Sequence, residues 1–302
     1  MKNSLTAFSI CIPIYNYDVS ILVKELYKQS LETHLPFEIL LMDDRSSILQ
    51  KENRLLGELP FVTYMELKEN IGRAKIRNRL AQAAQYPYLI FMDCDTETNQ
   101  PDYIRKYLNI LPADIVAGGY AYSLVPPEKE YLLRWHYGRN REEIPAAVRN
   151  QHPNKSFSTF NFMIRKDLFE QVRFDETISG YGHEDTLFGW ALRQEGVTIK
   201  HIDNSLLHKS LDDSATFISK IENSVKNLWH IYQLIPEKKE FSQDNKLLRC
   251  YLIFKKYHLT FLISIFSFVA RPILLCNLKS KHPKMLCMDL FKLVELNRSS
   301  SV

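Results

Sequence analysis

The first 117 residues alternate between apolar runs of strand length and amphipathic segments with helical spacing. Phe8–Ile14, Glu38–Met42 and Tyr88–Met92 are almost continuously apolar, which is typical of strands that are buried on both faces of a parallel sheet. Weaker strand signals lie at 62–67, 114–117, 158–164 and 197–202. We therefore expect an α/β fold, in which helices cover both faces of a largely parallel sheet.

Local signals place several helix ends. Asp18 is a candidate N-cap for the first helix, and Pro101 suits the first position of a later one. A helix over Glu184–Glu195 would end at Gly196, which can act as its C-cap. Residues 121–155 are polar, contain prolines and are weakly periodic, so we expect an irregular segment or a mobile flap there.

Charge is unevenly distributed along the 302 residues. The whole chain carries +4, but residues 246–302 hold ten Lys and Arg against two Asp and Glu, a local balance of +8. A mildly acidic body with a basic tail argues against a nucleic-acid partner and favours an anionic membrane surface. We expect a catalytic domain over residues 1–235 and a basic, apolar, helical extension over 236–302.

The extension contains an apolar run, Leu259–Ala270, between the basic residues Lys255, Lys256 and Arg271. The run is shorter than the roughly 20 residues that a helix needs to span a bilayer. It can be a helix packed on the catalytic domain or an interfacial helix with cationic flanks. With basic residues on both sides, we expect peripheral membrane contact through 249–292.

The five cysteines include no C-x-x-C pair, and their number is odd. This pattern argues against a disulfide framework and against a zinc site. We therefore expect a reduced compartment, which for this protein is the cytoplasm. If the C-terminal segment contacts a membrane, we expect the protein at the inner face of the cell membrane.

An acidic motif directly follows the apolar run Tyr88–Met92. In Asp93-Cys94-Asp95, the two carboxylates are two residues apart and share a face if the segment is extended. Ligands of open α/β sheets bind beyond the carboxyl ends of the strands. Two carboxylates combined with phosphate oxygens form a hard oxygen site suited to Mg²⁺ or Mn²⁺. Because D-x-D also occurs by chance, a polar strand end is the alternative.

Asp43-Asp44 ends the second apolar run in the same way. Adjacent residues point to opposite sides of a strand, so one carboxylate can face a ligand while the other caps the following turn. A cap formed with Ser46 is an equal alternative for either residue taken singly.

Asn70–Asn78 joins a glycine turn to a basic helix that we expect over Gly72–Ala84. The helix N-terminus and the arginines can face a phosphate group, and Arg73 and Arg77 lie four apart on one helical face. A solvated basic face is the alternative.

Two later segments add candidate residues. Gly180–Asp185 combines two glycines with an acidic pair, Glu184 and Asp185, that begins a helix. One carboxylate can act as a general base toward an acceptor hydroxyl, although acidic residues in a first helical turn are often only partners of the helix dipole. A lone histidine is most often a structural residue. Beside carboxylates, however, the neutral imidazole of His208 is a reasonable further metal ligand.

Together and in this order, these segments resemble glycosyltransferase family 2, whose members have the GT-A fold. That fold is a Rossmann-like, mixed and mainly parallel sheet flanked by helices. The resemblance runs from about Ser9 to His208. The opening strand corresponds to Ser9–Asn16, the second-strand motif to Leu41–Ser46 and the metal motif to Met92–Asp95. Residues 180–185 are similar to the G-x-G-x-E-D segment of galactosyltransferase and chondroitin-polymerase-type enzymes.

The resemblance implies a nucleotide-sugar donor site. Asp44 would contact the nucleotide base, and Arg77, in a stretch similar to N-x-G-x-x-x-x-R-N, would lie near the nucleotide. Pro13, Tyr15 and Asp93 are assigned to the same donor site.

The resemblance also implies a metal and an acceptor site. Asp95 is the expected direct ligand of Mn²⁺ or Mg²⁺, and His208 falls where many GT-A enzymes have a metal-binding histidine. Glu184 and Asp185 would bind the acceptor, with Asp185 as the base. The chain departs from the family pattern in two places: Arg45 replaces the usual glycine, and Ser158-Thr159-Phe160 replaces Gly-Gly, with Asn161 retained.

The implied reaction is a single displacement with inversion, from a UDP-sugar to a hydroxyl of a glycan or lipid-linked oligosaccharide, in polysaccharide or glycan synthesis. One alternative is a nucleotidyltransferase of related fold, which would usually carry a glycine- and lysine-rich loop where this chain has residues 15–18, Tyr-Asn-Tyr-Asp. The other is a catalytically inactive GT-A-like scaffold, against which the intact Asp44, Asp95 and Asp185 argue.

Overall fold

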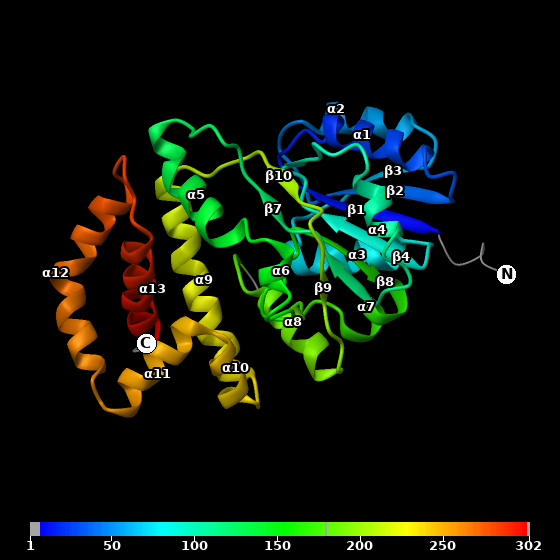
Figure 1. The fold of residues 1–302 in the computed structure, drawn as a ribbon. Helices are drawn as coiled ribbons and strands as arrows, with labels where there is room; N and C mark the ends of the chain where they lie inside the picture. Colours follow the sequence, from blue (N-terminus) through cyan, green and yellow to red (C-terminus); the bar gives the residue numbers. More distant parts are fainter. Residues whose placement is uncertain (1–6, 179, 301–302) are drawn as a thin grey trace. The chain divides into compact units, whose positions relative to one another are not determined.

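The computed structural model describes residues 7–178 and 180–300, and Figure 1 shows its helices and strands. The chain forms two compact units. The sheet unit takes in the described residues up to Ser123, together with 142–176 and 185–210. The helical unit takes in 124–141, the described residues of 177–184 and those from 211 onward.

A seven-stranded sheet runs through the sheet unit in the order β3-β2-β1-β4-β8-β6-β9. Every neighbouring pair is parallel except the two pairs formed by β8, which is antiparallel to β4 and β6. The mainly parallel sheet predicted from the sequence is therefore confirmed. The strands are β1 (Phe8–Ile14), β2 (Phe37–Asp43), β3 (Val62–Glu66), β4 (Tyr88–Met92), β6 (Ile115–Ala117), β8 (Asn161–Arg165) and β9 (Lys200–His201).

A smaller sheet of three short strands, in the order β5-β10-β7, accompanies the large one. Its strands are β5 (Thr96–Glu97), β7 (Tyr120–Ala121) and β10 (Leu206–His208). β5 follows directly from the end of β4, so this small sheet brings later parts of the chain to the carboxyl end of β4.

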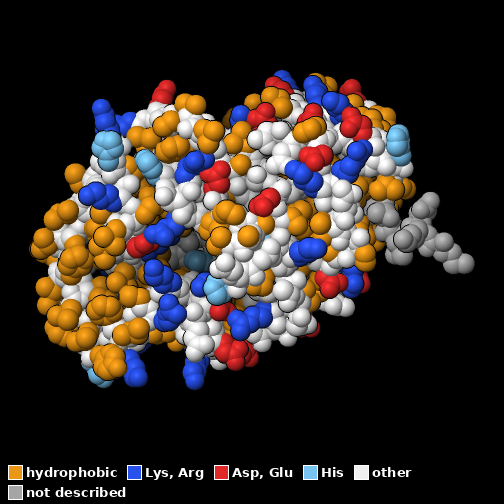
Figure 2. Space-filling view, viewed as in Figure 1, with side chains coloured by type: hydrophobic (Ala, Val, Ile, Leu, Met, Phe, Trp, Pro, Cys, Tyr) orange, Lys and Arg blue, Asp and Glu red, His pale blue; other side chains and the backbone are white. Residues whose placement is uncertain are grey.

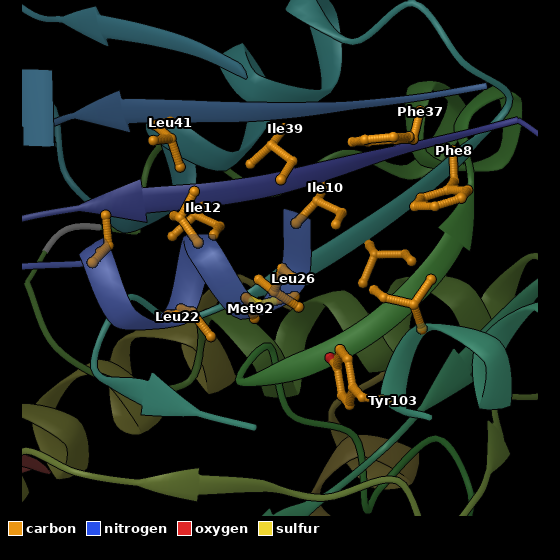
Figure 3. Packing of buried hydrophobic residues seen from close by; sticks show 14 of the residues in the cluster. Phe8, Ile10, Ile12, Leu22, Leu26, Phe37, Ile39, Leu41, Met92 and Tyr103 are labelled. Atoms are coloured by element: carbon orange, nitrogen blue, oxygen red, sulfur yellow. The ribbon is translucent and has the colours of Figure 1, made fainter. Parts of the chain in front are cut away.

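The central strand β1 packs on both faces because successive side chains point to opposite sides. On one face, Ile10 and Ile12 pack with Leu22 and Leu26 of the first helix (Figure 3). On the other face, Cys11 belongs to a second buried cluster. Helices α1 (Ser20–Leu31) and α4 (Tyr103–Leu108) contribute to the first cluster, and α3 (Arg73–Ala83), α7 (Lys166–Val172) and α8 (Glu184–Gln194) to the second.

Three local predictions were wrong. The N-cap of α1 is Val19, and Asp18 lies one residue earlier, where its carboxylate accepts the Ser20 N–H at 2.8 Å. Pro101 lies in a turn before α4, whose N-cap is Asp102. The strand predicted over 197–202 is limited to β9, because only its last part pairs with β6.

The segment 121–155, predicted as irregular or as a mobile flap, contains short helices instead. Each of them is too short to show a periodic apolar pattern in the sequence. They are η2 (Lys129–Tyr131), α5 (Leu132–Tyr137), the π-helical turn η3 (Gly138–Glu142) and α6 (Ala146–Arg149), and the remaining short helices of the chain are α2 (Gln50–Arg54) and η1 (Leu55–Glu58).

The helical unit is built mainly from the C-terminal part of the chain. Its long helix α9 precedes the boundary that we expect after residue 235, yet it groups with the helices that follow it. That boundary stays a prediction. The helices are α9 (Ser214–Leu234), α10 (Lys238–Asp244), α11 (Lys246–Lys256), α12 (Thr260–Leu278) and α13 (Met285–Ser300).

The apolar run Leu259–Ala270 is part of a longer helix than predicted. Helix α12 has 19 residues and continues through Arg271 and Pro272. Within the helical unit, Arg271 forms ion pairs with Glu222 and Glu295. By length and composition alone, α12 can cross a membrane, but a buried helix of a water-soluble protein can pass the same test.

A buried arginine joins the last strands of the large sheet. Arg149, only 6% exposed, donates all of its N–H groups to neutral acceptors: the carbonyls of Ile144, Ala117, Gly118 and Ile202, and Nδ1 of His201. The opposite ring nitrogen of His201 lies 2.8 Å from the Pro153 carbonyl, so a neutral imidazole satisfies both contacts. Burial is the main cause that lowers the pKa of His201 to about 4, and Arg149 lowers it further.

This arrangement predicts a loss of stability in mild acid. The unfolded chain protonates this histidine near its ordinary pKa of 6.5, whereas folded His201 resists protonation down to about 4. The unfolded state therefore binds more protons as the pH falls through this window, and the free energy of unfolding should fall by up to about 3 kcal/mol.

Urea unfolding of wild type and His201→Gln at a series of pH values measures this effect. The variant should lose much of the pH dependence, with a remainder from His183, whose pKa burial also lowers to about 4. The exposed His34 provides the matched control, His34→Gln, which should behave as wild type. An unchanged pH dependence in His201→Gln would contradict the assignment.

Candidate active site

The carboxyl end of β4 carries the D-x-D motif, and its two carboxylates have different partners. Asp93 forms an ion pair with Arg77, whose side chain is almost fully buried. Arg77 also donates to the Arg73 carbonyl at 3.3 Å and lies over the Phe174 ring. Asp93 is thus neutralised by the helix α3 that was predicted to carry the basic face.

Asp95 faces a different residue, His208. Strand β10 pairs antiparallel with β5, which sets His208 opposite Thr96, the residue after Asp95. The Lys209 amide donates to the Asp95 carbonyl at 2.9 Å. His208 Nε2 lies 3.6 Å from Asp95 Oδ2, so the structure brings together the two residues that were predicted to bind a metal.

The His208 ring is held between aromatic rings of the sheet unit. It stacks on Phe160 with a centroid separation of 5.4 Å and on Tyr122 with a separation of 5.6 Å. Phe160 in turn stacks on Tyr120 at 4.0 Å. Phe160 stands where the family pattern has glycine, and its ring here fixes the plane of the imidazole.

The Asp95 carboxyl lies in an environment that favours a cation. Burial is the main cause that raises its pKa, Asp93 raises it further, and His208 and Arg73 lower it. A half-buried carboxylate that is only partly compensated gains from a bound positive charge. Mixed oxygen and nitrogen donors suit Mn²⁺ better than Mg²⁺, which prefers oxygen ligands alone.

Across residues 7–178 and 180–300, no cluster of three or more His, Cys, Asp or Glu forms a metal cage. With Asp93 engaged by Arg77, the protein donors are Asp95 and His208. Two protein ligands fit a divalent ion that completes its coordination with phosphate oxygens and water. The donor set therefore fits a metal that binds together with a diphosphate.

Asp43 and Asp44, at the end of β2, have different roles, as predicted for adjacent residues. Asp43 is buried and caps the turn, because its carboxylate accepts the Ser46 N–H and the Tyr64 hydroxyl. The two oxygens of Asp44 accept the backbone N–H groups of Ile71 and Gly72, at 2.7 and 3.0 Å. Each carboxylate oxygen has a second lone pair, so Asp44 can still accept from a nucleotide base.

Arg45, which replaces the family's glycine, has a φ of +60°. This left-handed conformation is the one that glycine adopts without steric cost. The turn is also tied to the loop after β1, where the Asn16 amide donates to Ser46 Oγ and Asn16 Oδ1 accepts the Ser47 N–H. The substitution therefore leaves a glycine-like turn in place.

Pro13 and Tyr15 lie at the carboxyl end of β1, beside β2 and β4. Pro13 pairs in register with Met42, and the Tyr15 backbone hydrogen-bonds to the Cys94 thiol. The Tyr15 side chain is 54% exposed. Both residues therefore share the sheet edge that carries Asp93 and Asp95, and their donor contacts stay predictions.

The acidic pair Glu184 and Asp185 begins helix α8, after Gly180 and Gly182 with φ values of +81° and +94°. Asp185 Oδ1 accepts the Thr186 N–H at 2.7 Å. Asp185 belongs to the sheet unit, whereas Glu184 belongs to the helical unit. Their predicted roles in binding and deprotonating an acceptor stay predictions.

Burial is the main cause that raises the pKa of Tyr120 well above its ordinary value, and the charges of Glu142, Asp185 and Asp93 raise it further. That Asp185 and the D-x-D motif share one pocket stays a prediction.

Three residues at this site were missed as candidates: Tyr120, Tyr122 and Phe160. Each contributes a ring to the stack around His208. The signal that could have found them is the aromatic pattern Tyr-Ala-Tyr directly after Gly118-Gly119, at the end of a predicted strand.

Residues 9–173, more than half of the chain, match the sequence profile of glycosyl transferase family 2. The chain belongs to this family. The prediction of a glycosyltransferase is therefore confirmed. The match favours this class over the alternative of a nucleotidyltransferase.

The chain is similar to several curated enzymes. The chain is 24% identical to the chondroitin synthase of Escherichia coli in an alignment of 247 positions that covers 68% of this chain and 34% of that protein. It is 29% identical to the validoxylamine A glucosyltransferase of Streptomyces hygroscopicus subsp. limoneus in an alignment of 225 positions that covers 63% of this chain and 48% of that protein. The chain thus spans less than half of the length of these relatives.

Solved structures share the fold of this glycosyltransferase. The mannosyltransferase PcManGT of Pyrobaculum calidifontis, in complex with GDP-Man and Mn²⁺, aligns with a TM-score of 0.60 at 14% identity, over 97% of this chain and 85% of that one. GalNAc-T7 with UDP, GalNAc and Mn²⁺ aligns with a TM-score of 0.57 at 14% identity, over 82% and 52%. At such identities the likeness shows the fold alone, which is the expected GT-A fold.

The Arg77–Asp93 ion pair predicts a thermodynamic coupling. Arg77→Met removes a buried cation and leaves Asp93 without its partner, so the free energy of unfolding should fall by about 3 kcal/mol. Adding Asp93→Asn removes the uncompensated charge and should recover at least about 1 kcal/mol of that loss. Chemical unfolding of the two single variants and the double variant measures the coupling. Simple additivity of the two single effects would disprove the pairing.

Proposed function

We propose that this glycosyltransferase moves a sugar from a nucleoside-diphosphate sugar, with UDP as the nucleotide, onto an acceptor hydroxyl with inversion. The proposal is carried by one observation: Asp95 and His208 meet at the carboxyl end of β4, while Arg77 neutralises the neighbouring Asp93. This leaves a half-buried carboxylate beside an imidazole, an arrangement that suits a metal–diphosphate, with the basic helix α3 following the neighbouring loop.

The donor nucleotide would bind along the loops after β1, β2 and β4. Asp44 holds the loop that begins α3 and accepts from the base through its remaining lone pairs. Pro13 and Tyr15 would border the nucleotide, and the ion pair with Arg77 holds Asp93 in place beside it. The exposed Arg73, whose charge reaches Asp95, would draw the diphosphate to this edge.

Asp95 and His208 would hold Mn²⁺, or Mg²⁺, which this oxygen and nitrogen donor set suits less well. The bound ion would neutralise charge on the diphosphate leaving group. The stack of Phe160 and Tyr122 on His208 keeps its Nε2 directed at Asp95, so that the pair is preorganised. Preorganised ligands avoid the cost of ordering them when the donor binds.

Asp185 would take the proton from the acceptor hydroxyl, and Glu184 would help to bind the acceptor. A hydroxyl that loses its proton as it attacks the anomeric carbon, opposite the departing diphosphate, gives a product of inverted configuration. NMR of the product's anomeric proton tests this stereochemistry, and retention would contradict it.

The acceptor class we propose is a growing glycan or a lipid-linked oligosaccharide, in the synthesis of a polysaccharide or glycan. Support comes from relatives named as chondroitin and hyaluronan synthases and from the basic, apolar C-terminal helices. A lipid-linked acceptor would bring the enzyme to the inner face of the cell membrane.

Asp95→Asn tests the donor site. In wild type, UDP or a UDP-sugar with Mn²⁺ should raise the melting temperature, because a ligand that binds only the folded state stabilises it. The variant should fold normally and lose the Mn²⁺-dependent part of this rise. Glu32→Gln, an exposed carboxylate at the end of α1, is the matched control and should respond as wild type. A full response in Asp95→Asn would reject the metal assignment.

Asp185→Asn and Glu184→Gln separate the base from its neighbour. Loss of a general base should lower the rate of transfer by about 10²- to 10⁴-fold, while the nucleotide-induced thermal shift stays as in wild type. Glu184→Gln should mainly weaken acceptor binding and raise KM for the acceptor. If Glu184→Gln shows the large loss of kcat and Asp185→Asn does not, the roles are exchanged.

A further inference from the structure

The exposed face of helix α12 is apolar along its whole length. Phe268 is 88% exposed and Ile265 66%, and only 22% of the helix is buried. Figure 2 shows the resulting apolar surface at the left of the view. This exposed face comprises Phe261, Leu262, Ile265, Phe266, Phe268, Val269 and Ile273.

The charged side chain of α12 is turned toward the rest of the helical unit. Arg271, the one charged residue of this helix, donates to Glu222 of α9 and Glu295 of α13, both at 2.7 Å. Ser264 accepts from Asn297 of α13 at 2.9 Å. A surface helix in water has the opposite arrangement, with its apolar stripe inside and its charges outside.

Cationic residues surround the apolar face. Lys255 and Lys256 precede α12, and Lys279, Lys281 and Lys284 follow it, all of them exposed. Residues 255–284 contain no Asp or Glu, so no acidic side chain of this stretch offsets these charges. An apolar face bordered by lysines matches the boundary between acyl chains and anionic headgroups.

We propose that α12 lies in the plane of an anionic membrane surface, with its exposed face inserted at the level of the headgroups and the first acyl carbons. The occupant of this face is a lipid surface. The inference uses the helical unit alone and does not depend on the proposed sugar transfer.

The contacts of Arg271 argue against a transmembrane α12. If α12 crossed the membrane, Arg271 would lie in the hydrocarbon core. It would either lose its ion pairs with Glu222 and Glu295 or bring these two carboxylates into the core as well. Either course is costly, because charges in the bilayer centre are strongly disfavoured. In the in-plane arrangement the ion pairs remain on the protein side of the helix.

The lysines argue against a second copy of this chain as the occupant. If two copies met through α12, the lysines at each end of one helix would approach lysines of the other in both the parallel and the antiparallel arrangement. With no acidic residue between 255 and 284, this contact would have no compensating ion pair. Like charges across an interface disfavour it.

Vesicle co-sedimentation of the full chain tests the proposal. The chain should bind phosphatidylcholine vesicles that contain phosphatidylglycerol, and bind pure phosphatidylcholine vesicles more weakly. Ile265→Ser/Phe268→Ser should reduce binding to both, by about tenfold or more, because two inserted apolar side chains are lost. The matched control is Ile21→Ser/Leu55→Ser, two equally exposed apolar residues of the sheet unit, which should bind as wild type.

A charge variant isolates the electrostatic contribution to vesicle binding. Lys279→Gln/Lys281→Gln/Lys284→Gln should weaken binding to the anionic vesicles by about fivefold per lysine and leave binding to neutral vesicles unchanged. Added salt should reproduce this loss in wild type.

Three results would overturn the proposal. The first is wild-type protein that stays in the supernatant with anionic vesicles, or an Ile265→Ser/Phe268→Ser variant that binds as well as wild type. The second is a wild-type dimer in light scattering that this variant converts to a monomer, which would make α12 an interface between copies. The third is resistance of the cellular protein to alkaline carbonate extraction, which would make α12 a spanning helix. None of these results bears on the nucleotide-induced thermal shift, so failure of this inference and of the proposed function are distinguishable.

Discussion

The position of β1 between β2 and β4 is the constraint on which the site depends. β1 is hydrogen-bonded on both edges and buried on both faces, so it cannot shift without breaking two ladders and two packed layers. The parallel pairing makes β1, β2 and β4 end at one edge of the sheet. Residues that follow these strands, such as Asp44 and Asp93, therefore lie at the same edge of the sheet although about 50 positions separate them in the chain.

The division of charge at this edge gives each carboxylate its own role. Arg77 compensates Asp93, whereas Asp95 lies beside the imidazole of His208 and is influenced by the charge of Arg73. A half-buried carboxylate in that state is a favourable partner for a cation. The aromatic stack on His208 adds orientation, and Phe160, where the family has glycine, takes part in it. The departure from the family pattern thus has a structural use.

The two units place apolar and charged side chains in opposite ways. In the sheet unit, apolar runs are enclosed by helices, as expected for a protein in water. In the helical unit, α12 turns its one charged residue inward and its phenylalanines outward. An enzyme that extends glycans on lipid carriers gains from such a face, because its substrate is confined to the same surface.

The sequence alone determined the elements whose signals are local. The strands β1 and β4 have their predicted bounds because a continuous apolar run of strand length allows little else, and D-x-D directly after β4 indicated the candidate metal site. Tertiary structure decided what depends on partners far away in the chain. It assigned Arg77 to Asp93, ended the strand near residue 200 at the few residues that pair with β6, and paired Arg271 of α12 with Glu222 and Glu295. It also assembled the rings of Tyr120, Tyr122 and Phe160 around His208, since strand pairing between β5, β7 and β10 has no signature within any one segment.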